Sequence, residues 1–254
     1  MHNNNNNYPS SPRAWLTVFI LMLAYVLSFV DRQILNLLVG PIRADLQISD
    51  TEMSLLMGLS FAVFYTVCGI PLGRLADTRS RRGIIAFGVV FWSFATAACG
   101  LAKNYWHFFA ARIGVGVGEA ALSPSAYSLI TDSFPPGKRA TALSAYSMGI
   151  YLGEGLAFLL GAKVIQFALQ QGDQLLPLVG SVRPWQLIFL LLGAVGVVFS
   201  LVLFLLQEPQ RKGAGANQNV PLREVIAFLK TNRKTVLLHN LGFACLAFSS
   251  YGAG

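Results

Sequence analysis

Four ionisable residues stand inside stretches of the chain that are otherwise apolar. Asp31 and Arg32 are neighbours in the first apolar run, and Arg112 and Glu119 lie seven residues apart in the fourth. A charged side chain at the centre of a membrane helix costs about 2.5–3.5 kcal/mol even on lenient insertion scales. Two interpretations follow: structural ion pairs that hold helices in register, or a buried aqueous cavity that handles protons or a substrate.

The composition places these residues in a membrane protein. Of 254 residues, 54% are hydrophobic and 12% are charged, and the mean hydropathy is +0.56. A soluble domain has about 25% charged residues. The apolar runs are continuous rather than alternating, which favours helices over a β-barrel. The net charge of +8 does not indicate a nucleic-acid partner, because the basic residues lie in short loops between the apolar runs.

The positions of the apolar runs divide the chain into four parts. Residues 1–13 are polar and of low complexity, and we expect a disordered cytoplasmic tail. Residues 14–206 are expected to form a six-helix transmembrane bundle, followed by a polar cytoplasmic linker over 207–234 in which VPLREVIAFLK forms a surface helix. Residues 235–254 are interpreted as a truncated seventh helix. The six predicted spans are 14–39, 53–75, 83–102, 105–130, 140–168 and 185–206.

The distribution of Lys and Arg sets the expected orientation. With the N-terminus in the cytoplasm, thirteen of the 19 Lys and Arg residues lie inside, four lie outside, and Arg32 and Arg112 lie within spans. Cytoplasmic loops carry an excess of Lys and Arg. We therefore predict a multi-pass plasma-membrane protein with a cytoplasmic N-terminus, in a bacterial inner membrane.

The loop between the second and third spans carries a motif. GRLADTRSRR, residues 73–82, resembles the G-x-L-x-D-R-x-G-R-R/K signature of the major facilitator superfamily, with Thr78 and Ser80 as departures. Gly73 would let two helices approach closely, and Asp77 would pair with an arginine or cap a helix. In that family the loop latches two halves of the protein. The resemblance implies a conformational latch made by Gly73, Asp77, Arg81 and Arg82.

The fourth and fifth spans resemble the same superfamily. RIGVGVGEA, residues 112–120, is similar to its R-x-x-x-G-x-G pattern, and its three glycines thin the helix surface for close contact. The fifth span contains Gly149, Gly153, Gly155 and Gly161, similar to the glycine-rich stretch of family antiporters. Glu154 stands where that stretch has proline. It is either an intramembrane protonation site or an ordinary interfacial residue near the outer end of the span.

FVDRQIL, residues 29–35, together with RIGVGVGEA resembles the spinster branch of the superfamily, which includes lysolipid transporters. The resemblance implies an all-α fold in which two inverted three-helix repeats place the first and fourth spans at equivalent cavity-lining positions. It also implies proton coupling through Asp31, with Glu119 in the same cavity network. Glu154, as an intramembrane acid, is a further candidate for proton coupling. Arg32 and Arg112 then form the substrate and charge network.

The expected function is proton-coupled secondary active transport of a small organic or lysolipid-like substrate by alternating access. The expected partners are the lipid bilayer, the substrate, protons and a missing C-terminal six-helix half; we expect no cofactor or metal. Two alternatives remain: a half-size transporter that acts as a homodimer, and a receptor or scaffold with this fold that does not transport. An enzyme is disfavoured, because the three histidines are widely separated and no nucleophile or metal motif is present.

Overall fold

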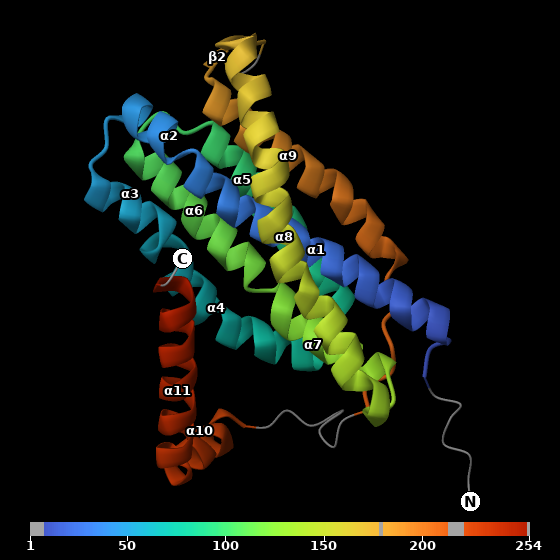
Figure 1. Cartoon of the computed structure of the whole chain (residues 1–254). Coiled ribbons are helices and arrows are strands. Elements are labelled where there is room, and N and C mark those ends of the chain that lie inside the picture. Colours follow the sequence, from blue (N-terminus) through green and yellow to red (C-terminus); the bar gives the residue numbers. More distant parts are fainter. Residues whose placement is uncertain (1–7, 178–179, 213–220, 253–254) are drawn as a thin grey trace, which may run out of the picture. The chain divides into compact units, whose positions relative to one another are not determined.

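The computed structural model describes residues 8–177, 180–212 and 221–252 (Figure 1). The chain falls into two units, Met1–Lys212 and Gly213–Gly254, and each is described by itself. The first unit is a helical bundle with one short hairpin. Its elements are α1 (Ser11–Leu37), α2 (Val39–Leu46), α3 (Asp50–Met57), α4 (Leu59–Thr78), α5 (Arg81–Gly100), α6 (Tyr105–Glu119), α7 (Leu122–Ser133), α8 (Pro136–Gln171), β1 (Gln174–Leu176), β2 (Gly180–Val182), α9 (Pro184–Ser200) and the 3-10 helix η2 (Leu201–Leu205).

Helices distant in the sequence make the main contacts of the bundle. The most extensive contacts join α1 to α8 and α5 to α9, while α6 packs on both α4 and α5. Figure 1 shows α8 crossing α1 at an angle. One continuous apolar core includes Leu21, Leu35, Val89, Phe108 and Phe189, all fully buried or nearly so.

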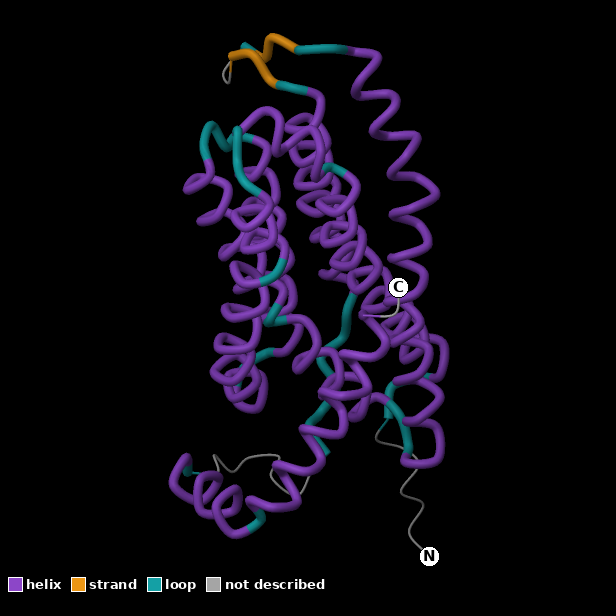
Figure 2. The backbone as a smooth tube through the Cα atoms, turned by 60° about the vertical axis from the view of Figure 1, so that its left-hand side comes forward, coloured by secondary structure: helices purple, strands orange, loops and turns teal. Residues whose placement is uncertain are grey.

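The two ends of the bundle have different loops. The start of α1, the α4–α5 turn and the segment after η2 lie at one end, which we call the basic end after its arginines 74, 79, 81 and 82. The α2–α3 turn, the α5–α6 turn and the antiparallel β1–β2 hairpin, which pairs Gln174 with Val182, lie at the other, called the hairpin end (Figure 2). This hairpin lies between the fifth and sixth predicted spans, where no strand was predicted.

Among the described residues, five helical stretches are long and apolar enough to cross a membrane: Ser11–Leu37, Asp50–Thr78 (α3 and α4 together), Arg81–Gly100, Pro136–Gln170 and Pro184–Leu205 (α9 and η2 together). The remaining predicted span, 105–130, is present as two shorter helices, α6 and α7, that meet at residues 120–121. Pro124 explains the interruption, because proline has no N–H to donate to the carbonyl of Ala120. The backbone tightens there, with Ala121 N–H donating to Gly118 instead of continuing the regular ladder.

The second unit contains two described helices, α10 (Leu222–Thr231) and α11 (Arg233–Gly252). The segment VPLREVIAFLK, which we predict as a surface helix, contains most of α10, whose Ile226 and Phe228 side chains are exposed. The predicted seventh span corresponds to α11, which is 20 residues long but is not among the five helices that are apolar enough to cross a membrane.

Candidate functional site

The centre of the bundle holds an ion pair between α1 and α6. One Glu119 oxygen, Oε2, accepts from Arg32 Nη2 at 2.5 Å, from Arg32 Nε at 2.8 Å and from Ser28 Oγ at 2.6 Å. Glu119 is 1% exposed, whereas the Arg32 side chain is 26% exposed. The arginine therefore reaches from a partly open space to a buried carboxylate.

Three aromatic rings surround the Arg32 guanidinium. Its Cζ atom lies 4.8 Å from the centre of the Phe29 ring, 4.5 Å from that of Phe61 and 5.1 Å from that of Tyr65. Cations are attracted to the faces of such rings within about 6 Å. The rings and Glu119 together fix the position of the guanidinium.

Asp31 and Arg112 form the other half of the charge cluster. Asp31 is 4% exposed, and its Oδ2 accepts from Thr96 Oγ1 of α5 at 2.5 Å. Arg112 is 1% exposed, and its Cζ lies 5.6 Å from the centre of the Phe61 ring. Within the described residues, four buried atoms of this cluster have no hydrogen-bond partner: Asp31 Oδ1, Arg112 Nε, Arg112 Nη1 and Glu119 Oε1. Buried polar atoms are normally satisfied, so these are places for a proton, water or ligand.

The pairing differs from the one that the sequence suggests. The neighbours Asp31 and Arg32 do not pair with each other, and among the described residues neither Asp31 nor Arg112 makes an ion pair within 4.0 Å. Successive residues on an α-helix point about 100° apart. Asp31 consequently faces Thr96 on α5, while Arg32 faces Glu119 on α6.

Glycines bring the helices of the site close together, as expected. A Cβ atom added at Gly116 would lie 2.7 Å from the backbone oxygen of Phe61 on α4, and one at Gly118 would lie 2.7 Å from Trp92 Cβ on α5. Real Cβ atoms do not approach so closely, so larger residues would push these helices apart. Gly114 is tight as well, with Ala95 Cβ at 3.0 Å.

The glycines of α8 serve the contact with α1 in the same way. An added Cβ would come within 2.9 Å of Met22 O at Gly149, 2.7 Å of Phe29 Cβ at Gly153 and 2.7 Å of Leu37 Cδ1 at Gly161, but would meet nothing within 4 Å at Gly155. Glu154 lies half-buried near the middle of the 36-residue helix α8. It makes no hydrogen bond or ion pair with any described residue, so no contact joins it to the central cluster.

At the basic end, Arg81 is the centre of a second cluster. Arg81 is 0% exposed; it forms an ion pair with Asp132 of α7, and its Nε donates to Glu208 Oε1 at 2.7 Å. Its Nη2 also donates to Pro209 O at 2.8 Å. The other Glu208 oxygen accepts from Ser80 Oγ at 3.0 Å and from the Arg82 backbone N–H at 2.9 Å. The segment after η2 is thus bound to the α4–α5 turn.

The remaining motif residues take lesser parts in this cluster. The Arg82 guanidinium donates to Leu206 O at 3.2 Å. Asp77 is exposed, and a Cβ added at Gly73 would lie an ordinary 3.7 Å from Pro124 Cβ, so the α4–α7 contact does not require glycine there. Partial burial raises the pKa of Glu208, but the hydrogen bonds from Arg82 and Arg81 outweigh it and hold the pKa below its usual value.

Comparison with known proteins identifies the fold. Residues 21–253 match the family model described as Major Facilitator Superfamily. The chain belongs to the Major Facilitator Superfamily. The major facilitator bundle has a close structural counterpart in a bacterial homologue of the human lysosomal transporter spinster, solved in an inward-facing and unoccupied conformation. The two are 35% identical with a TM-score of 0.71, over 81% of this chain and 45% of that chain.

Relatives in sequence agree with this placement among major facilitators. The chain is 28% identical to protein spinster of Drosophila melanogaster over 237 residues, which cover 92% of this chain and 36% of that protein. It is also 28% identical to a D-galactonate transporter of Escherichia coli over 206 residues, covering 81% and 44%. The predicted resemblance to the spinster branch is confirmed. The chain spans less than half the length of these relatives.

Sequence reasoning missed the uncharged and distant members of both clusters. Ser28 and Thr96 are common in apolar helices, so nothing in the sequence singles out the hydroxyls that contact Glu119 and Asp31. Asp132 and Glu208 stand near predicted span ends, where acids are unremarkable. Their shared contact with Arg81 becomes visible only in the fold.

Proposed function

We propose that this bundle is one half of a proton-coupled secondary transporter that works by alternating access, and that it is not an enzyme. The observation that carries the proposal is the central cluster, in which two acids and two arginines lie in an apolar bundle with only one ion pair made among them. Merely structural charges would be expected to satisfy one another, because an unpaired buried charge is costly.

The proposed substrate class is a small organic anion. Arg112 has two buried nitrogen atoms without a described partner, and a planar guanidinium suits a carboxylate or phosphate group. The similarity to a D-galactonate transporter favours a hydroxylated carboxylate. The resemblance of FVDRQIL and RIGVGVGEA to the spinster branch favours a lysolipid-like anion. In either case Arg112 meets the anionic group, and Arg32 joins it when it leaves Glu119.

The proposed coupling uses Asp31 and Glu119 as proton carriers. Protonation of Glu119 would weaken its bonds to Arg32, and protonation of Asp31 would remove the negative charge beside Arg112. The first step frees the Arg32 guanidinium, and the second leaves the already unpaired Arg112 without a nearby negative charge. Both changes favour a different packing of α1 against α6. A unit charge that crosses 100 mV gains about 2.3 kcal/mol, which shifts a two-state equilibrium roughly fifty-fold. Glu154, which lacks a contact with the cluster, is the weakest of the three candidate protonation sites.

The proposed placement follows the distribution of basic residues. The basic end faces the cytoplasm of a bacterium, and the bundle lies in the inner membrane with a second six-helix half completing the cavity. The turn around Arg81 and Arg82 acts as the latch in this proposal, with Asp77 left exposed for the second half. Glu208 ties the turn to the segment that leads onward to α10.

Flux in proteoliposomes tests the proposal. The chain is reconstituted alone and together with the C-terminal half of the similar bacterial spinster homologue, and uptake of radiolabelled D-galactonate or a lysolipid is driven by a pH gradient. Asp31→Asn is expected to abolish gradient-driven uptake, whereas Asp50→Asn, which alters a carboxylate that is 84% exposed, leaves it intact. Normal transport against a gradient by Asp31→Asn would make Asp31 structural and refute the coupling.

A further inference from the structure

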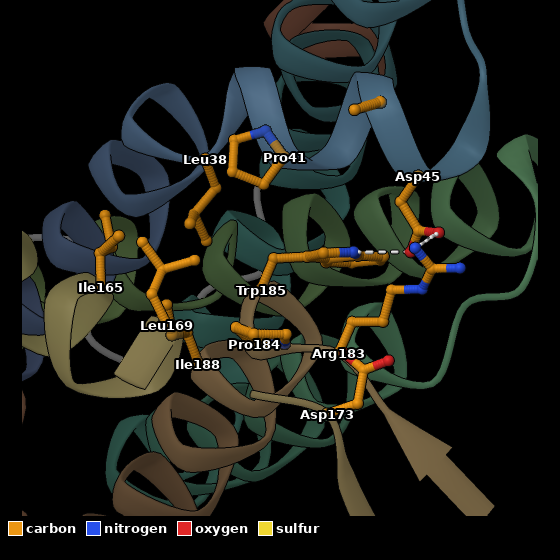
Figure 3. A pocket seen from close by; sticks show the side chains of 11 residues that line it. Leu38, Pro41, Asp45, Ile165, Leu169, Asp173, Arg183, Pro184, Trp185 and Ile188 are labelled. Atoms are coloured by element: carbon orange, nitrogen blue, oxygen red, sulfur yellow. Dashed lines mark hydrogen bonds and ion pairs between the residues drawn. The ribbon is translucent and has the colours of Figure 1, made fainter. Parts of the chain in front are cut away.

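A bipartite pocket lies at the hairpin end, away from the central cluster. Its apolar part is a cavity of about 240 Å³ between the α1–α2 junction, the last turns of α8 and the start of α9 (Figure 3). Leu38, Pro41, Ile165, Leu169 and Ile188 form its apolar wall. Its size suits part of a ligand, such as a length of acyl chain, rather than a whole drug-sized molecule.

A polar cavity of about 310 Å³ adjoins the apolar one. The two share Asp45, Asp173 and Arg183, and the polar cavity adds Lys103 and Gln186. An amphipathic molecule can therefore place its head in one part and its chain in the other. The indole of Trp185 lies on the apolar side with its Nε1 donating to Asp45 Oδ2 at 2.8 Å, as dashed in Figure 3. Such rings prefer the boundary between hydrocarbon and water.

The charged side chains that line the two cavities include equal numbers of acids and bases. Asp45 is occupied by the indole and by Arg183 Nη1, which lies 2.8 Å from its Oδ1. The Arg183 side chain is 56% exposed, which leaves donors open to a ligand. Asp173 and Lys103 are exposed and make no hydrogen bond or ion pair with described residues. The open groups are one carboxylate and two cations, one of which is already neutralised by Asp45.

We propose that this pocket binds a bilayer phospholipid with an ammonium headgroup, such as phosphatidylethanolamine. Its phosphate lies between Lys103 and Arg183, its ammonium donates to Asp173, and one acyl chain enters the apolar cavity. The headgroup of an anionic lipid such as phosphatidylglycerol has no positively charged group to pair with Asp173. A choline head is a cation without N–H groups, so it cannot donate a hydrogen bond to that carboxylate.

The depth of the pocket agrees with a lipid headgroup. It lies at the ends of membrane-length helices, where α8 stops at Gln171 and α9 begins at Pro184. Trp106, at the start of α6 and at the same end, is 70% exposed. Exposed tryptophan at a helix end is typical of the membrane interface.

Native mass spectrometry of the detergent-purified full chain tests the proposal, with phosphatidylethanolamine, phosphatidylcholine and phosphatidylglycerol of identical acyl chains as probes. One phosphatidylethanolamine is expected to be retained at least tenfold more tightly than either of the others. Asp173→Asn should lower its affinity about tenfold, the value of one charge-assisted hydrogen bond. The control Asp50→Asn removes the same charge from the same end and should leave the affinity unchanged.

A second pair of variants tests the apolar cavity. Ile165→Trp fills the space and should abolish retention, whereas Leu160→Trp on the same helix, at a side chain that is 52% exposed and outside the pocket, should not. Circular dichroism verifies the helical content of both. Equal retention of the three lipids, or unchanged binding in both Asp173→Asn and Ile165→Trp, would overturn the proposal.

Discussion

Removing the charge of Glu119 should loosen the contact between α1 and α6. Glu119→Gln keeps the shape of the side chain but changes three bonds to a carboxylate oxygen into bonds to a neutral amide. Hydrogen bonds to charged groups contribute about 1 kcal/mol more than neutral ones, which gives at most about 3 kcal/mol. Because Arg32 is 26% exposed and is also held by three rings, we expect a loss of about 2 kcal/mol. For a chain of this size, that lowers the unfolding midpoint by about 4–8 °C.

The assay is thermal unfolding in detergent, followed by circular dichroism, in a double-mutant cycle with Arg32→Gln. The two substitutions remove the same interaction, so the coupling energy should be about 1.5 kcal/mol or more. Arg43→Gln is the control, because Arg43 pairs with the 84% exposed Asp50 and exposed pairs contribute about 0–1 kcal/mol. A coupling energy below about 0.5 kcal/mol would refute the claim that this pair joins the two helices.

Three further predictions concern the basic end and the glycine contacts. Since the pKa of Glu208 is lowered in the folded chain, its contacts stabilise the fold above about pH 4.5 and are lost as the pH falls through the folded pKa. The difference in unfolding midpoint between wild type and Glu208→Gln should therefore shrink in acid. A difference that stays constant with pH would contradict this. Arg81→Gln should cost about 3 kcal/mol or more of stability in denaturant unfolding, because it leaves Asp132 without its buried partner; a loss under 1 kcal/mol would argue against the cluster. Gly118→Ala should lower the free energy of unfolding by about 1–3 kcal/mol, because its Cβ would meet Trp92. The Cβ of Gly155→Ala meets nothing within 4 Å, so this variant should raise the free energy of unfolding by up to about 1 kcal/mol. Equal effects of the two substitutions would contradict the packing described for α6 and α8.

Much of the fold was predictable because apolar runs of membrane length have few alternatives. Five of the predicted runs, among them those that contain Trp15 and Trp185, are helical close to their predicted bounds. The break between α6 and α7 was not predicted, although Pro124 indicates one. A mean hydropathy over the span does not register the loss of one backbone hydrogen bond. The β1–β2 hairpin was missed because its strands have three residues each.

The members of the central site were predictable but their partners were not. Buried charges stand out against apolar surroundings, and all four lie in one region between α1, α5 and α6. Their pairing depends on how each helix is rotated about its own axis, and the proximity of two residues in the sequence does not reveal this rotation. Hence Arg32 pairs with Glu119 across 87 positions rather than with the adjacent Asp31.

Proton movement that accompanies transport measures the proposed role of Asp31 in proton coupling. Proteoliposomes that contain the chain together with the C-terminal half of the bacterial spinster homologue are loaded with a pH-sensitive dye, and an inward gradient of D-galactonate or another anion found to be transported is imposed. With the wild-type protein we expect the lumen pH to change as the anion enters. Asp31→Asn should abolish this pH change, and Asp50→Asn should preserve it. Undiminished proton movement with Asp31→Asn would show that Asp31 does not carry the coupled proton.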